Sequence, residues 1–371
     1  MTNFQTSSGR SIHIVMIATL LWILGHETKA QQYEWNVAGI TEGAWNMTDK
    51  KTGWNNLLEI GGSIGLWKGA KLEATAIGTY QLDYPVVEDI QVFSNISAGT
   101  NRAFRLLHGG ISQELGKHWL VFAGLRNVDT DYFGTPFTCL FTGSSNGNFP
   151  VLSGNFPLGT FPMAALSIHA EYRPYENLTF KETVYNGVAD DRLEHQFRIR
   201  PDKDGVLNIG SVSYDLNAGK KHEGSYTIGY ALGTQPKEVD EEAEMTEDEL
   251  TYNYALWALA EQNLCKIGST KLGALLQGGM APAERSACRY YWGAGLTLGG
   301  ITPNDGQVGV VVNRAIMADG TETSTELTGH FPVFEHFAIQ PAVHCIRTNG
   351  HTTFAGLLRL SFEFGGATNK D

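Results

Sequence analysis

Apolar and polar side chains alternate along most of the chain from Tyr33 onward, in runs of about ten to fifteen residues separated by turns. In the last run, Leu358 and Leu360 belong to one face, whereas Arg359 and Glu363 belong to the other. A period of two is typical of a β-strand that lies between an apolar and an aqueous environment. About sixteen strands are predicted, near residues 35–45, 57–65, 70–83, 102–115, 118–129, 163–175, 177–189, 205–217, 224–235, 250–264, 272–282, 289–301, 307–318, 324–333, 337–348 and 352–364.

The lengths of the links between the predicted strands indicate which β-fold this is. Long links follow the first, third, fifth, seventh and ninth strands, at 46–56, 84–101, 130–162, 190–204 and 236–249. Short links follow the second, fourth, sixth and eighth strands, at 66–69, 116–117, about 176, and 218–223. Outer-membrane barrels have short periplasmic turns and longer outside loops. We therefore predict an all-β fold, a transmembrane antiparallel β-barrel, although alternation alone would also suit a β-sandwich.

The loop at 130–162 is the longest of these links and is rich in Gly, Ser, Asn, Phe and Pro. Long loops without secondary structure are uncommon in compact domains and are usually functional where they occur. We predict that this third outside loop folds into the lumen and constricts it.

Residues 1–30 have the parts of a secretory signal peptide. Arg10 is a basic flank, Ser11 to Leu24 form a short apolar core, and Ala30 ends the segment with a small residue. Cleavage is expected before Gln31, which leaves 31–371 as the barrel domain. The alternative is an N-terminal anchor helix, but the apolar run is short for a membrane helix.

Charge and cysteine spacing exclude several classes of ligand. The formal net charge is −12, which disfavours nucleic acid as a partner. The four cysteines, at 139, 265, 288 and 345, lack the spacing of a metal site, so neither metal nor cofactor is expected. Disulfides can form in an exported chain, and the spacing leaves their pairing open. The acidic segment 238–249 is interpreted as a solvated outside loop, with a cation or lipopolysaccharide contact as the alternative.

Catalytic motifs are missing from the sequence, which has no nucleophile elbow, zinc-protease motif, phosphate-binding loop or dinucleotide fingerprint. His169 and Glu171 share a strand face and would suit an acid–base pair, but the polarity of a lumen face is the favoured explanation. The acidic pairs Asp129–Asp131 and Asp190–Asp191 would suit a glycosidase. Polar entry into outside loops is the favoured explanation, and we predict that the protein is not an enzyme.

Sugars present hydroxyl groups on one side and apolar C–H faces on the other. A channel for them needs donors, acceptors and aromatic rings that bind weakly enough to release the solute. The polar candidates for such a lining are Arg105, His108, Arg126, Asp129, Asp131, His169, Glu171 and Arg359. The aromatic candidates are Tyr132, Phe133, Phe137, Phe141 and Phe149. For each of them singly, a strand-end anchor or ordinary loop packing is the favoured explanation.

The stretch from Gly124 to Asp191 resembles the carbohydrate-selective porins of the OprB family. The resemblance rests on the order and spacing of several short pieces, and weaker similarity continues to the end of the chain. These pieces are Gly124 with Asp129, Asp131 and Phe133; Ser144-Ser145; Phe149-Pro150; Asn155-Phe156-Pro157; Phe161 to Leu166; Tyr172-Arg173-Pro174; Asn177-Leu178; and Tyr185-Asn186-Gly187.

The resemblance implies a monomeric sixteen-stranded outer-membrane barrel for the diffusion of sugars, narrowed by the third outside loop. The chain departs from the family pattern in three places. Gly365 to Asp371 follow Phe364 where a final aromatic residue is usual, 238–249 is an acidic insertion, and cysteines are unusual in a porin.

The leading hypothesis is passive, weakly selective diffusion of mono- or oligosaccharides across an outer membrane of the Gram-negative type. The expected partners are carbohydrate solutes and outer-membrane lipid or lipopolysaccharide. The alternatives are a structural or adhesive barrel without sugar flux and a secreted glycan-binding β-protein.

Overall fold

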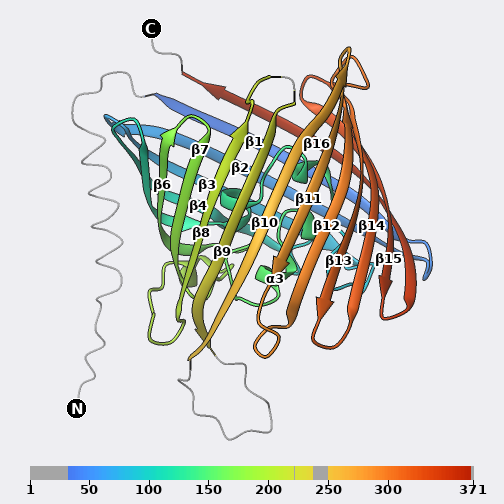
Figure 1. Ribbon diagram of the computed structural model, residues 1–371, viewed down its shortest axis with the longest axis horizontal. Helices are drawn as coiled ribbons and strands as arrows, with labels where there is room; N and C mark the ends of the chain where they lie inside the picture. The colour runs from blue at the N-terminus through green and yellow to red at the C-terminus, as the bar shows by residue number, and fades with distance from the viewer. Residues whose placement is uncertain (1–31, 221, 237–249, 369–371) are drawn as a thin grey trace, which may run out of the picture.

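The computed structural model describes residues 32–220, 222–236 and 250–368. Within these residues, sixteen antiparallel strands form a closed barrel, in which each strand pairs with the next and β1 pairs with β16 (Figure 1). The predicted signal peptide, at 1–30, and the acidic segment, at 238–249, lie outside the described residues.

The strands in chain order are β1 (Tyr33–Asn46), β2 (Lys51–Trp67), β3 (Ala70–Leu82), β4 (Arg102–Leu115), β5 (Trp119–Arg126), β6 (Ala165–Tyr175), β7 (Leu178–Asn186), β8 (Val206–Leu216), β9 (Gly224–Pro236), β10 (Leu250–Ile267), β11 (Thr270–Met280), β12 (Cys288–Gly299), β13 (Gln307–Met317), β14 (Thr321–Phe334), β15 (Phe337–Thr348) and β16 (His351–Ala367). This confirms the barrel and its sixteen predicted strands.

The first outside link is shorter than predicted. Instead of a long loop at 46–56, only residues 47–50 join β1 to β2. The Asn46 side-chain oxygen accepts hydrogen bonds from the backbone N–H groups of Thr48 and Asp49, each at 3.0 Å, and so stabilises a tight turn. The first residues of β2 are mostly polar, which hides this part of the strand from a search for apolar alternation.

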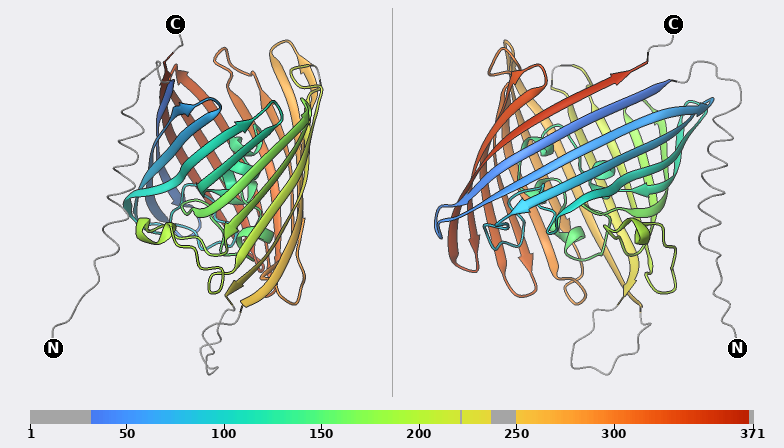
Figure 2. Two further views of the ribbon diagram at one scale, coloured as in Figure 1. Left: turned by 90° about the vertical axis from the view of Figure 1, so that its left-hand side faces the viewer. Right: turned by 180° about the vertical axis from the view of Figure 1, so that it is seen from behind.

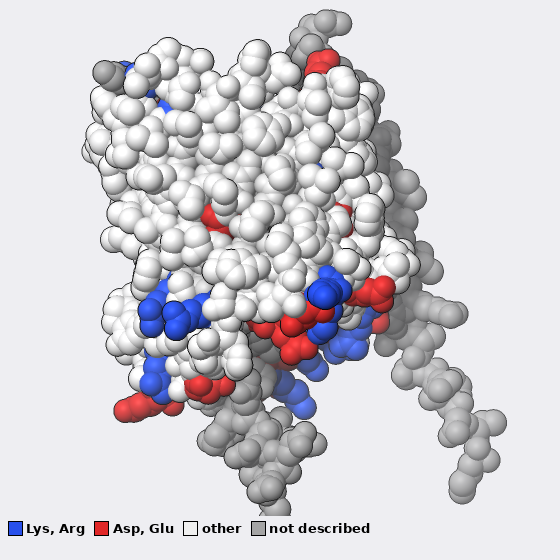
Figure 3. Space-filling model, turned by 90° about the vertical axis from the view of Figure 1, so that its right-hand side faces the viewer, with Lys and Arg blue, Asp and Glu red and all other residues white. Residues whose placement is uncertain are grey.

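The outer wall of the barrel is apolar. In β16, for example, Leu358 and Leu360 are exposed, whereas their neighbours Leu357 and Arg359 are buried inside. On the face shown in Figure 3, charged side chains gather toward the lower end and the wall above them is largely free of charge. Apolar side chains outside and polar ones inside suit lipid around the barrel and water within it.

The two ends of the barrel differ in their connections. Short turns such as 68–69 and 176–177 lie at the end where β1 begins and β16 finishes. The opposite end carries loop L2 (residues 83–101), loop L3 (residues 127–164) and the link 187–205. In outer-membrane barrels the short turns are periplasmic, so we call the end with L2 and L3 the external end.

Helices are short and few in the described part of the chain. Loop L3 contains α2 (Val128–Tyr132), η1 (Thr138–Leu140), η2 (Ser144–Asn146) and α3 (Pro150–Ser153), and the link 187–205 contains α4 (Leu193–Gln196). None of these described helices has the length and apolar character needed to span a bilayer. In all three ribbon views the helices of L3 lie within the outline of the barrel (Figure 2).

Candidate functional site: the barrel lumen

Loop L3 turns away from the wall directly after β5. The Asn127 side chain caps α2 by accepting hydrogen bonds from the backbone N–H groups of Asp129 (3.0 Å) and Thr130 (3.4 Å). The Asp129 carboxylate in turn accepts a hydrogen bond from the Phe161 N–H at 2.8 Å, which joins the start of L3 to its end. Burial raises the pKa of Asp129 to about 7, although the Phe161 N–H opposes the shift. Asp129 therefore holds the base of the loop.

Four strands on the far side of the lumen anchor L3 by hydrogen bonds. Tyr132 donates its hydroxyl to the Ile209 carbonyl on β8 at 2.9 Å. Glu261 on β10 accepts from the backbone N–H groups of Phe137 and Thr138 at 3.1 and 3.2 Å, and from the Thr135 hydroxyl. Gln277 on β11 and Gln340 on β15 donate to the Asn146 and Leu140 carbonyls at 2.6 and 2.7 Å. These contacts extend L3 along the inner face from β8 to β15.

An apolar core lies between L3 and this wall. The Phe133 and Phe149 ring centroids are 4.9 Å apart, and Phe133 lies 4.8 Å from Trp257 on β10. Tyr132, Phe133, Phe141 and Phe149 are all buried in this core. These four predicted aromatic lining residues therefore present no ring face to a solute in this conformation, and they fix the loop to the wall.

Loop L2 also folds inward, which the sequence did not suggest. The Glu322 carboxylate on β14 accepts hydrogen bonds from the backbone N–H groups of Ile90 and Gln91 at 2.8 and 2.9 Å. L2 and L3 are joined by backbone hydrogen bonds from Ser144 N–H to the Val92 carbonyl (2.9 Å) and from Asn95 N–H to the Thr142 carbonyl (2.7 Å). The two loops are thus hydrogen-bonded into one unit that lies against the inner faces of β8–β16.

Arg359 lies behind loop L2. Its guanidinium donates to Glu42 on β1 at 2.7 and 3.0 Å and to the Asn95 side chain at 2.9 Å. The Arg359 and Glu42 side chains are only 7% and 0% exposed. This predicted lining residue therefore forms a buried ion pair that ties L2 to the wall.

The inner faces of β3–β7 carry the remaining polar candidates. Arg126 at the end of β5 forms a two-point ion pair with Asp131 of α2, with a separation of 2.7 Å from Nε to Oδ2. The Arg126 guanidinium also lies 4.5 Å from the centroid of the Phe122 ring. Lys181 on β7 donates to the Asp131 carbonyl at 2.7 Å. Arg126 and Asp131 are thus brought together where L3 leaves the wall.

A β-bulge places two further candidates in β4. Thr75 pairs with His108 and Ala76 pairs with Leu106, so Leu107 is an extra residue in the strand. His108 then lies 3.2 Å from the Glu73 carboxylate on β3, and both side chains are partly exposed. Arg105, three residues earlier, is buried and donates to Asp191 at 3.2 Å and to the Thr100 carbonyl at 3.0 Å. His108 is accessible from the lumen, whereas Arg105 holds the external links together.

His169 and Glu171 are not coupled to each other. The His169 ring bonds to the Thr183 hydroxyl at 2.7 Å and is buried, whereas Glu171 pairs with Arg173. The pairs of Arg126 with Asp131 and of His108 with Glu73, together with the bond from Lys181 to the Asp131 carbonyl, line the inner face from β3 to β7. The described residues contain no group of His, Cys, Asp and Glu placed to hold a metal ion.

Sequence reasoning missed Glu73, Phe122, Lys181 and loop L2 as parts of this site. Their positions on alternating strands would have indicated the lumen for Glu73 and Lys181, but nothing in the sequence indicates the inward path of L2. The four cysteines, whose pairing the sequence left open, are unpaired.

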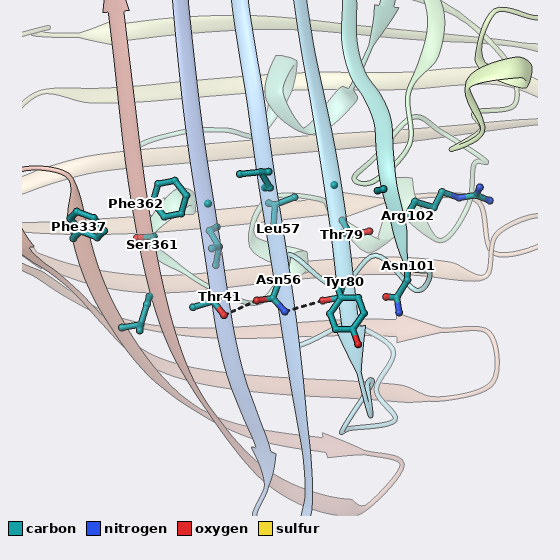
Figure 4. Close-up of a pocket in the computed structure, with 16 residues that line it drawn as sticks. Thr41, Asn56, Leu57, Thr79, Tyr80, Asn101, Arg102, Phe337, Ser361 and Phe362 are labelled. Atoms are coloured by element: carbon teal, nitrogen blue, oxygen red, sulfur yellow. Dashed lines mark hydrogen bonds between the residues drawn. The ribbon is translucent and has the colours of Figure 1, made fainter.

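An apolar groove of about 720 Å³ lies outside the lumen, on the outer wall across β16, β1, β2 and β3 (Figure 4). Tyr80 and Phe362 flank it, and Gly39 and Gly78 form part of its floor. Asn56 accepts a hydrogen bond from Thr41 at 2.7 Å and donates to the Tyr80 carbonyl at 3.2 Å, so its polar atoms are satisfied. Because these side chains point away from the lumen, the groove belongs to the wall that faces lipid.

A family model described as carbohydrate-selective porin, OprB family, matches residues 47–364. The chain belongs to the OprB family. The high-pH structure of Pseudomonas putida OprB has a TM-score of 0.73 and 15% identity, and the match covers 94% of this chain and 97% of that chain. An anion-selective porin from Comamonas acidovorans has a TM-score of 0.57 and 13% identity, over 90% of this chain and 99% of that chain. No curated protein sequence matches significantly.

As a carbohydrate-selective porin of the OprB family, the protein is an outer-membrane β-barrel through which sugars diffuse. Because the solved structures are only 13–15% identical to this chain, these matches support the fold alone. The resemblance noted between Gly124 and Asp191 is confirmed by a match that covers most of the chain.

Proposed function

We propose that sugars cross this OprB-family porin passively, through the part of the lumen between loop L3 and the inner faces of β3–β7, with L3 as the constriction. We call this part the lumen lane. The observation that carries the proposal is that L2 and L3 are anchored to β8–β16, while Glu73, His108 and Arg126 lie on the opposite wall, where Arg126 pairs with Asp131 of L3.

The chemistry of these four side chains suits a neutral, hydroxyl-rich solute. Guanidinium and imidazole N–H groups donate hydrogen bonds, and the carboxylates accept them. Each charge already has a partner of opposite sign, so a passing sugar exchanges one hydrogen bond for another and is not held tightly. Weak binding of this kind permits selectivity without blocking flux.

The test of this proposal is liposome swelling with glucose, arabinose and sucrose. The paired variant R126Q/D131N removes both charges together and leaves no unpaired ion. We expect the sucrose-to-glucose ratio of swelling rates to change by about twofold or more, because a net hydrogen bond contributes roughly 1 kcal/mol. R314Q, on the outer wall, is the matched control and should leave the ratio unchanged.

Unchanged sugar selectivity in R126Q/D131N would remove this ion pair from the lumen lane. Wild-type barrels that are folded but pass no sugar would instead favour a structural or adhesive barrel. Partition of the native protein into the soluble periplasmic fraction would favour a secreted glycan-binding protein.

The absence of catalysis is part of the proposal. His169 is bonded to Thr183 and Glu171 to Arg173, so these two residues do not form an acid–base pair. Asp129 binds the Phe161 N–H and supports the loop, and Asp190 pairs with Arg192 at 2.9 Å. Each suspected catalytic carboxylate thus has a structural partner.

The assembly state and the lipid partner also belong to the proposal. We infer a monomer, as the resemblance to the family implies, and the mass of the protein in detergent tests this. An outer-leaflet lipopolysaccharide is proposed as a contact of the external rim. Support for it comes from Arg314 and Arg347, which lie in one register row with Thr323 between them.

A further inference from the structure

A second cavity lies on the periplasmic side of loop L3, away from the Arg126–Asp131 pair. Its volume is about 460 Å³, within the usual range for ligand pockets. The tip of L3, residues 134–137, forms one side of it, and the inner faces of β8–β13 with their periplasmic turns form the other. Unlike the apolar core on the other side of L3, this cavity is lined mostly by polar side chains.

Phe137 provides the aromatic surface of this cavity. Among the five aromatic residues suggested by the sequence, all of which the structure describes, it alone is not buried. Its backbone N–H donates to Glu261 at 3.1 Å, and its ring lies directly over Gly273 on β11. A Cβ at residue 273 would overlap the ring, so Gly273 is what lets the ring lie against the wall. The ring is therefore fixed in place with its remaining surface toward the cavity.

The polar lining offers acceptors arranged around this ring. Glu261 uses its Oε1 atom for all three of its hydrogen bonds to L3, and Asp215 accepts from Ser225 through Oδ1 at 2.7 Å. Among the described residues, Glu261 Oε2 and Asp215 Oδ2 have no hydrogen-bond donor. Lys271 lies 3.6 Å from Glu223 and adds an ammonium group. With Asp305, the lining holds four carboxylates and one ammonium.

We propose that this cavity is a sugar-binding subsite on the periplasmic side of L3. A neutral pyranose packs its apolar C–H face on Phe137 and donates hydroxyl hydrogens to Glu261, Asp215 and Glu223. The excess of carboxylates repels sugar acids, so the subsite selects neutral over anionic sugars. The proposal rests on the proposed sugar flux and adds a second contact beyond the lumen lane.

The test uses the purified barrel in a planar bilayer, with glucose added to both sides and the conductance measured as a function of glucose concentration. F137L removes the ring but keeps an apolar side chain over Gly273, and G273A displaces the ring without changing it. We expect both variants to raise the half-blocking glucose concentration by about threefold to tenfold. Glucuronate should block the wild-type channel more weakly than glucose does.

The control is G309A on β13, whose added methyl group meets Leu140 and Phe141 of the same loop but not the cavity. It should leave the half-blocking glucose concentration near that of the wild type. An equal rise in G309A, F137L and G273A would overturn the proposal, because the effect would then follow from disturbing L3. Wild-type-like blocking in both F137L and G273A would also overturn it.

Liposome swelling of the same proteins separates this inference from the proposed function. If the wild type passes glucose but F137L and G273A leave glucose blocking unchanged, the subsite is wrong and sugar diffusion stands. If the wild type passes no sugar, the proposed function itself fails. Because G273A retains Phe137, a folding failure of F137L alone still leaves the subsite testable.

Discussion

At the scale of single residues, the charged groups inside this barrel act mainly by pairing with one another. One ion pair, between Arg359 and Glu42, joins β16 to β1, which lie at opposite ends of the chain. Another, between Arg126 and Asp131, joins β5 to loop L3. A buried ion pair adds little net stability, but removing one partner leaves an unpaired charge at a high cost. These pairs therefore fix the positions of the loops more than they stabilise the wall.

The Arg359–Glu42 pair allows this to be measured. E42L leaves the buried guanidinium without its carboxylate and should lower the free energy of unfolding by about 3–5 kcal/mol. E42L/R359M removes both charges, so its free energy of unfolding should fall by much less than that of E42L. Urea unfolding in lipid vesicles, followed by tryptophan fluorescence, gives both values. Equal destabilisation of the single and double variants would contradict the buried-pair explanation.

At the scale of elements, both L2 and L3 are held by carboxylates that accept backbone N–H groups. Glu322 holds L2 through Ile90 and Gln91, and Glu261 holds L3 through Phe137 and Thr138. A carboxylate that accepts several backbone N–H groups positions a loop with little contribution from the side chains of that loop. In each loop, one carboxylate of the wall therefore fixes two neighbouring backbone N–H groups.

Replacing Glu322 tests this role of the carboxylate. E322A removes the acceptor for both L2 N–H groups, so we expect L2 to leave the lumen part of the time. Single-channel recordings should show a larger mean conductance with more current noise than the wild type. The neighbouring T323A, whose side chain points to the outer wall, should behave like the wild type. A conductance unchanged by E322A would show that other contacts suffice to hold L2.

The sequence predicted the strands better than it predicted the lining. Alternation is a local property, because successive side chains of one strand face lipid and water in turn. The strands of the wall could therefore be predicted from the sequence. Burial of a loop ring is not set locally. Phe133 and Phe137 lie in one segment of L3, yet one is buried against Trp257 and the other lines a cavity.

Local irregularities account for most of the remaining differences. The bulge at Leu107 shifts the alternation of β4, so Arg105 and His108 cannot be assigned to faces by counting in twos. The polar start of β2 concealed the short first turn. The inward path of L2 depends on Glu322, more than two hundred positions away, and no local pattern reports such a contact.

At the scale of the whole molecule, the barrel presents an apolar wall with charges gathered at its ends. Arg314 and Arg347 point outward near the external end, in register with Thr323 between them and Trp292 beside Arg314. Guanidinium groups bind phosphate with two hydrogen bonds, and a tryptophan at this depth suits the membrane interface. This row suits the phosphate groups of a membrane glycolipid.

R314Q/R347Q tests the lipid contact. The variant should retain less lipopolysaccharide through purification in mild detergent than the wild type, by about threefold or more, since two charge-assisted contacts are lost. Native mass spectrometry of the folded barrel measures the bound fraction. R173Q, at the periplasmic end, is a matched control whose side chain is 61% exposed inside the barrel. Equal retention in all three proteins would exclude this row as the lipid contact.

The position of L2 depends on strands that come much later in the chain. The hydrogen bond from Gln91 to Glu322 joins residues 231 positions apart, and L2 in turn bonds to L3. L2 cannot reach its place until β14 is present, and Arg359 cannot join it until β16 arrives. The pairing of β16 with β1 thus closes the wall and also brings Arg359 to Glu42 and to Asn95 of L2.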